Sequence, residues 1–307
     1  MLFQPLSHWN TSKRDTTTVA PLQRVTVWLD ELAPAQGTFV HALEWALMLR
    51  LPMRGIACPY GKGEPFPQAV VKSCQATCDR EGVPWSYGCE LVDQKNGTGG
   101  VPELQHDFCI LGGGLPRARQ KYIVQAALAS SGVGPLLCPP HWGALRRALV
   151  VSEGYSPESG YLDNAAMICR VAGCPASVLT LSHSVDAAGR LQDSAQKVFY
   201  GQGVPADFHT VVAGNARGAV AMVAGWRRCS HIFMEKSAPS AWRRWLGLNW
   251  TDATNDLIGS FAVLPIPANR SCLSSMISAA GYNGRLPDNV RLEKDSASTR
   301  ISPVTPG

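Results

Sequence analysis

The sequence predicts an α/β protein built from two tandem copies of one domain, each a five-stranded parallel sheet with helices packed on it. Short apolar runs that suit buried parallel strands alternate with segments of helical periodicity. The chain has 307 residues, enough for two domains of ordinary size. The order of elements in the first half recurs about 121 to 127 residues later, which indicates an internal duplication.

The first copy begins with the apolar run 25–29, a predicted buried strand. The apolar spacing of 39–50 fits an amphipathic helix. Residues 54–58 predict the second strand, and 68–81 a helix that Gly82 ends. The remaining predicted elements are strands at 85–92, 107–111 and 134–138, with a helix over 121–130.

The second copy repeats these patterns in the same order. The matched segments are 147–153 with 24–30, 177–181 with 54–58, GQGVP at 201–205 with REGVP at 80–84, 231–235 with 107–111, and 260–267 with 134–140. A helix is predicted over 160–171 and another over 214–228. The corresponding stretch 94–106 of the first copy is rich in glycine, so its helix is expected to be truncated or lost.

These patterns predict a first domain over 23–142 and a second over 143–269. The polar segments 1–22 and 270–307 are predicted to be a flexible arm and a flexible tail. A composition of 45% hydrophobic and 17% charged residues argues against global disorder. The net charge of +5 is too weak to indicate a nucleic-acid partner.

The same composition gives expectations about the compartment. No run of about 18 apolar residues indicates a membrane span, and the first residues lack a signal-peptide pattern. The ten cysteines are scattered and contain no CxxC pair, so we expect reduced thiols in a cytoplasmic protein without a metal site.

Several of these residues form a pattern typical of one family. Asp30 ends the first strand and is followed by a loop and a helix with Ala42, Leu43 and Ala46, while Glu153 ends the equivalent strand of the second copy. Both copies close on an apolar run that ends in proline. On these residues the chain resembles the universal stress protein family over about residues 24–268. The resemblance implies the five-stranded α/β fold and an adenine nucleotide, ATP or AMP, as ligand.

The phosphate loop of that family, G-x2-G-x9-G-[ST], is degenerate in both copies. In the second copy its positions hold Met234, Ser237, Gly247 and Leu248, so one of four motif residues remains. The first copy keeps a glycine run at 112–114, whose N–H groups could approach a phosphate closely, but lacks the later glycines.

The candidate nucleotide contacts follow from this comparison. In the first copy they are Asp30, Cys58, Gly112, Gly113, Gly114, Arg117 and Arg119, and in the second Glu153, Ser237 and Gly247. In the second copy Glu153 and Glu235 are expected at neighbouring strand ends, where two carboxylates would repel a polyphosphate. If either copy binds a nucleotide, the sequence favours the first. A glycine run is also typical of a plain turn, and Asp30 of a loop cap.

Four functions remain open from sequence alone. The leading one is a non-catalytic stress-response or regulatory binding protein. The second is an adenine-nucleotide-binding protein that uses the first copy. The third is an enzyme that uses Glu153 and Glu235, with Ser237 or His183 nearby. The fourth is a scaffold that binds an unidentified protein through Trp242, Arg243, Arg244 and Trp245, which could instead pack as an ordinary helix. The resemblance also implies that the closing strands, PLLC and FAVL, pair to make an intramolecular pseudo-dimer.

Overall fold

The computed structural model describes residues 23–29, 37–57, 67–89, 107–112, 134–139, 143–153, 160–182, 184–212, 216–235 and 261–266. The predicted arm and tail, the helix over 121–130 and the glycine-rich stretch 94–106 lie outside these residues, and the domain boundaries stay predictions.

The first half contains the elements that the apolar runs and helical spacings predict. They are β1 (Arg24–Leu29), α1 (Thr38–Leu49), β2 (Met53–Ala57), α2 (Gln68–Glu81), β3 (Trp85–Cys89), β4 (Asp107–Gly112) and β5 (Leu136–Cys138). None of the described helices is long and apolar enough to cross a membrane.

The second half repeats this order. Its elements are β6 (Ala148–Glu153), α4 (Tyr161–Val171), β7 (Ala176–Ser182), α5 (Val185–Gly201), β8 (Ala206–Val212), α6 (Ala216–Trp226), β9 (His231–Glu235) and β10 (Ala262–Ile266). The helix predicted over 214–228 is therefore confirmed as α6. The comparison of the two copies had not singled out α5 and β8.

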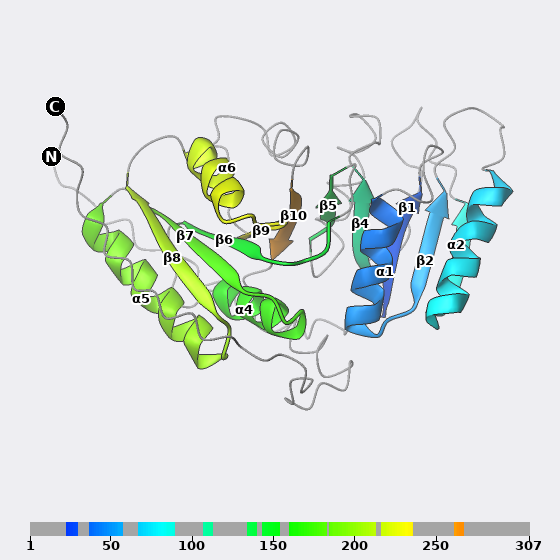
Figure 1. Cartoon of the computed structure of the whole chain (residues 1–307), viewed down its shortest axis with the longest axis horizontal. Coiled ribbons are helices and arrows are strands. Elements are labelled where there is room, and N and C mark those ends of the chain that lie inside the picture. Colours follow the sequence, from blue (N-terminus) through cyan, green and yellow to red (C-terminus); the bar gives the residue numbers. More distant parts are fainter. Residues whose placement is uncertain are drawn as a thin grey trace, which may run out of the picture.

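The strands form one continuous ten-stranded sheet in the order β3-β2-β1-β4-β5-β10-β9-β6-β7-β8 (Figure 1). Each half is parallel throughout. The pairing registers support the duplication, because β1 pairs Val25 with Phe108 while β6 pairs Ala148 with His231, and both partners lie 123 residues further along.

The repeated GVP motif has a structural reason at the end of α2 and of α5. Gly82 and Gly203 follow the two helices with φ of 71° and 70°, a left-handed conformation that favours glycine. The next residue, Val83 or Val204, is buried and donates its N–H to a carbonyl of the last helical turn, 2.9 Å away in both halves. This cap turns the chain from each helix into the following strand.

The two halves join where β5 pairs antiparallel with β10, with Leu137 opposite Val263. Both residues are at most 1% exposed. The family resemblance implies that these two closing strands pair. Their pairing merges the two five-stranded sheets into one.

Alternating side chains place a core on each face of the sheet. Val25 and Val27 of β1 belong to the core covered by α1, α2, α4 and α5, whereas Trp28 belongs to the opposite core, under α6. Each core contains residues of both halves, so the cores are continuous across the β5–β10 joint.

Helix α1 reaches across this joint to the second half. Its buried Trp45 packs on Phe108 of β4, with ring centroids 4.9 Å apart, and lies 6.4 Å from the ring of His231 in β9. The rings of His41 and His231 meet edge to face at 5.7 Å. Glu44 accepts a hydrogen bond from the N–H of Leu145, in the segment before β6.

Seven cysteines of the described segments are buried and free: Cys74, Cys78, Cys109, Cys138, Cys169, Cys174 and Cys229. Burial raises the pKa of the Cys74 thiol to about 12 and that of Cys229 to about 11. These side chains therefore act as small apolar core residues.

Trp45→Ala should lower the free energy of unfolding by about 3–5 kcal/mol, since it leaves a cavity against Phe108 and His231. Leu47→Ala is the matched control on the same helix, because Leu47 is 45% exposed, and should cost about 1 kcal/mol or less. Urea unfolding followed by circular dichroism measures both. Equal losses would contradict the central position of Trp45.

The histidine pair should make the fold sensitive to acid. Burial lowers the pKa of His41 from 6.5 to about 4 and that of His231 from 6.5 to about 3. Below pH 6.5 both imidazoles bind protons in the unfolded chain but stay neutral in the folded chain. Stability is thus complete above that pH and falls as the pH drops, by up to about 1.4 kcal/mol per pH unit for each histidine.

Urea unfolding at several pH values between about 7 and 5 measures this slope. His231→Phe places at 231 the residue found at the corresponding position 108. It should make the free energy of unfolding depend less on pH. An unchanged slope in this variant would show that other groups cause the acid sensitivity.

Candidate functional site

Each half of the sheet has one point where the chain order reverses, between β1 and β4 in the first half and between β6 and β9 in the second. In open α/β sheets, ligands bind outside the carboxyl ends of the strands at such points. Gly112 ends β4, and Glu153 and Glu235 end β6 and β9. The element order had predicted these positions.

The other predicted contacts lie outside the described residues. These are Asp30, Cys58, Gly113, Gly114, Arg117, Arg119, Ser237 and Gly247, together with Trp242, Arg243, Arg244, Trp245 and His183. The structure therefore tests the two switch points through the residues that border them.

In the first half, the switch point is bordered by two small residues. A Cβ atom placed on Gly112 would lie 2.2 Å from the Oγ1 atom of Thr38, the first residue of α1, so only glycine permits this approach. Gly37, the N-cap of α1, has no side chain that could cap the first turn, and that turn contains no acidic residue. Its partial positive charge is thus not offset by a side chain of the turn, which suits an anion.

In the second half, Tyr161 fills the corresponding place. It begins α4 as Thr38 begins α1, 123 residues earlier, and both follow a glycine, Gly160 and Gly37. The Tyr161 hydroxyl donates to the carbonyl oxygen of Val151 on β6 (2.9 Å) and lies 2.8 Å from that of Phe233 on β9. One side chain therefore bridges the two strands that border the switch point, and it is only 3% exposed.

Acidic groups surround this tyrosine. By the register of the sheet, Glu235 stands where the first half has Gly112. Burial, and then the negative charge of Glu235, raise the pKa of Tyr161 well above its usual value, so the phenol stays protonated. Asp163 lies in the first turn of α4 and offsets its positive end. Both helices follow an N-cap glycine that provides no side-chain cap. The contrast is that the second switch point is filled and acidic, whereas the described border of the first is small and has no acidic residue in the first turn of its helix.

No set of three His, Cys, Asp or Glu side chains within the described segments could hold a metal ion.

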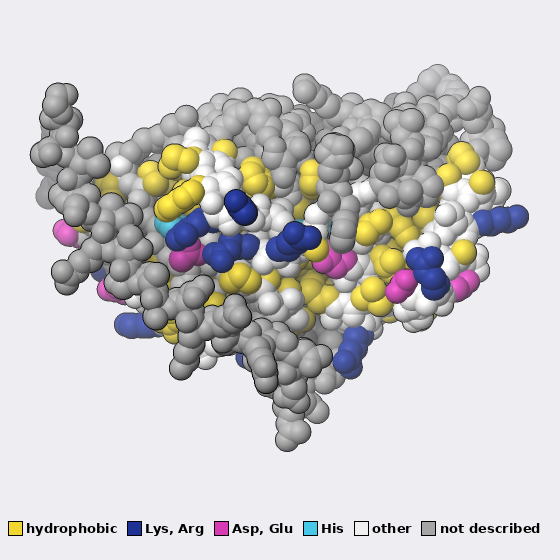
Figure 2. All heavy atoms as spheres, viewed as in Figure 1, with side chains coloured by type: hydrophobic (Ala, Val, Ile, Leu, Met, Phe, Trp, Pro, Cys, Tyr) yellow, Lys and Arg dark blue, Asp and Glu magenta, His cyan; other side chains and the backbone are white. Residues whose placement is uncertain are grey.

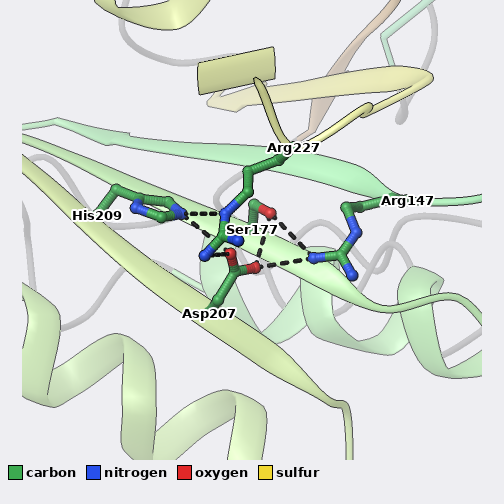
Figure 3. A network of polar contacts seen from close by, with 5 residues as sticks. All are labelled: Arg147, Ser177, Asp207, His209 and Arg227. Carbon is green, nitrogen blue, oxygen red and sulfur yellow. Dashed lines mark hydrogen bonds and ion pairs between the residues drawn. The ribbon is translucent and has the colours of Figure 1, made fainter. Parts of the chain in front are cut away.

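A second polar site lies on the α6 face, at the opposite, amino ends of the strands. A band of basic side chains with acidic ones between them crosses this face (Figure 2), and Figure 3 shows the part below α6. Asp207 of β8 accepts hydrogen bonds from Ser177 (2.7 Å) and Arg147 (3.0 Å), and forms an ion pair with Arg227. The Nε2 atom of His209 lies 3.0 Å from Asp207 Oδ2 and 3.0 Å from Arg227 Nε.

The first half has a simpler version of this cluster. Arg24 corresponds to Arg147, 123 residues later, and its Nε donates to Asp107 of β4 at 2.8 Å. Thr26 also donates to Asp107, at 2.6 Å. Each half therefore anchors an arginine near the start of its first strand, but the aspartate comes from the adjacent strand β4 in the first half and from β8, two strands away, in the second.

Sequence reasoning missed the Asp207 cluster because its members come from distant segments: β7, β8, the residue before β6 and the residue after α6. One signal was present: Asp207 and His209 are two residues apart in β8, so they share one face of that strand.

No protein-family model matches the chain, and no curated protein matches it. Solved structures do. The cytoplasmic domain of a prokaryotic cation chloride cotransporter is 13% identical, with a TM-score of 0.51 over 83% of this chain and 99% of its own. A universal stress protein from Pseudomonas aeruginosa UCBPP-PA14 is 12% identical, with a TM-score of 0.53 over 86% and 99%. These likenesses show that the chain has the universal-stress-protein-like α/β fold.

A universal stress protein in complex with cAMP is 17% identical and covers 41% of this chain and 100% of its own, with a TM-score of 0.33. That match carries no argument about the ligand of this chain.

Asp207→Asn should lower the free energy of unfolding by about 1–3 kcal/mol, because Arg147 and Arg227 would then face each other without a carboxylate. Glu81→Gln is the control, since it breaks the exposed Arg80–Glu81 pair and should change stability by about 0.5 kcal/mol or less. Urea denaturation compares the two. An Asp207→Asn variant with an unchanged free energy of unfolding would show that the cluster does not stabilise the sheet.

Proposed function

We propose that this chain is a non-catalytic regulatory binding protein whose first half alone takes up an adenine nucleotide. The contrast between the two switch points carries this proposal: Thr38 and Gly112 border the first, whereas Tyr161 and Glu235 occupy the second. An adenine nucleotide is the ligand that the family resemblance implies, and the predicted Asp30, Arg117 and Arg119 belong to the same half.

The polarity of the first site supports an anionic ligand. The N-terminus of α1 presents N–H groups that its N-cap residue, Gly37, leaves uncapped, and such groups bind phosphate oxygens favourably. In the second half, a carboxylate at position 235 and another in the first turn of α4 repel a phosphate at the same place.

We assign the protein a stress-response or regulatory role in the cytoplasm, without turnover. The buried, uncharged thiols of the described segments are compatible with a reducing compartment. Hydrolysis would need a nucleophile or a metal beside Glu153 and Glu235, and the nearest candidates, Ser237 and His183, lie outside the described residues. Partner binding through Trp242, Arg243, Arg244 and Trp245 stays a separate prediction.

Thermal unfolding with and without millimolar ATP and Mg²⁺ tests this proposal. A nucleotide at about 100 times its dissociation constant stabilises a folded protein by about 2.7 kcal/mol, which raises Tm by several degrees. Thr38→Tyr, which copies the second half, should abolish the shift. Thr38→Ser should keep the shift, because it retains the hydroxyl and adds no bulk to the site.

Tyr161→Phe is the second control, since it removes only the hydroxyl of the filled site. It should lower Tm without changing the ATP-dependent shift. A wild-type protein that ATP, AMP and ADP all leave unchanged would overturn nucleotide binding, and a shift that survives Thr38→Tyr would place the ligand elsewhere.

A further inference from the structure

Helix α6 presents an unusual outward face. Over 218–226, the part of α6 whose side chains are described, the exposed positions are Gly218, Ala221, Met222, Gly225 and Trp226, which recur at helical spacing and carry no charge. Met222 is 64% exposed and Trp226 is 62% exposed. The opposite face is apolar too, with Val220 and Val223 in the core. A surface helix normally carries polar groups on its outer side, and a helical stretch that is apolar on both faces, as 218–226 is, is normally covered.

Trp226 is held in place. Its ring lies 5.4 Å from that of His209, and the guanidinium of Arg227 stacks over it, 4.6 Å from the ring centroid. His209 and Arg227 are in turn fixed by Asp207 (Figure 3). An exposed tryptophan fixed in this way loses little conformational entropy when a partner covers it, as is typical of interface anchors.

Basic side chains outnumber acidic ones beside this face. Arg227 and Arg228 follow Trp226 directly, and Arg147 lies behind them, while Asp207 is the single carboxylate that the cluster contains among the described residues. Hydrophobic side chains over α6 and basic ones next to them are visible in Figure 2. A partner that matches this surface needs an apolar seam and carboxylates.

The small residues define how closely a partner can approach. A Cβ atom added to Gly225 would have no neighbour within 4 Å. Between Met222 and Trp226 the helix backbone is therefore accessible, and a partner helix can pack closely there.

We propose that the α6 surface, formed by Met222, Gly225, Trp226 and Arg228, docks an amphipathic helix of another protein that carries acidic residues beside its apolar seam. A second copy of this chain fits less well, because the described part of α6 offers no carboxylate to Arg228. The docking does not depend on the nucleotide site, which lies at the other ends of the strands.

Fluorescence anisotropy with two synthetic helical peptides tests the proposal on the full chain. Both peptides carry the same leucine seam, flanked by glutamates in one and by lysines in the other. The glutamate peptide should bind saturably and more tightly than the lysine peptide. Trp226→Ala should weaken its binding about tenfold or more, and Arg228→Glu should weaken the glutamate peptide while strengthening the lysine peptide.

Gly225→Gln separates docking from folding. It places a side chain in the approach path and raises helix propensity, so it should block the peptide while leaving Tm equal or higher. Tyr200→Ala and Arg190→Glu are matched controls on α5, where Tyr200 is 61% exposed on the opposite face, and should leave binding unchanged.

Three results would overturn the proposal: no saturable binding of the glutamate peptide, equal binding by wild type and Gly225→Gln, or a homodimer in sedimentation that Trp226→Ala dissolves. Binding of a single-stranded oligonucleotide that Trp226→Ala abolishes, in place of the peptide, would assign the surface to nucleic acid instead.

Discussion

The antiparallel pairing of β5 with β10 is the constraint on which the rest of the molecule depends. Each half is a parallel sheet that would otherwise end in a strand with unpaired backbone groups, and such an edge is prone to pairing with other chains. Leu137 and Val263 close both edges at once and carry the core under α6 across the joint, while Leu136 and Leu264 belong to the core on the other face. The same joint brings α1 of the first half within reach of β9, so the Trp45 and His41 contacts with His231 exist only because the strands meet in this way.

The fold and the ligand chemistry are determined by different residues, which allows the two copies to diverge. Buried strands and the glycine caps at Gly82 and Gly203 recur in both halves, since the backbone path requires them. The residue that starts the first helix of each half has no such constraint: threonine and tyrosine both occur there, and the strands keep the same register. A change at this single place can therefore fill one switch point without disturbing the sheet.

Much of the architecture could be predicted from the sequence because it depends on local patterns. Apolar runs gave the strands, and the shared order of elements gave the duplication and the positions of Gly112 and Glu235. The contacts of Tyr161 could not be predicted. Its hydroxyl meets the carbonyls of Val151 and Phe233, which are 10 and 72 residues away along the chain, and their two strands are adjacent only in the folded sheet. The Asp207 cluster was missed for the same reason. Asp30 and most of the other proposed contacts lie outside the described residues, so they remain predictions.

The buried cysteines have a consequence for how this protein can be studied and how it can react. A thiol is nucleophilic only as the thiolate, and burial keeps Cys74, Cys78 and Cys229 protonated, with pKa values of about 11 to 12. Oxidants and alkylating reagents therefore reach these sulfur atoms only after the surrounding core opens. The rate of modification at each cysteine reports how often its own part of the sheet opens, which provides a set of built-in probes of local unfolding in both halves of the chain.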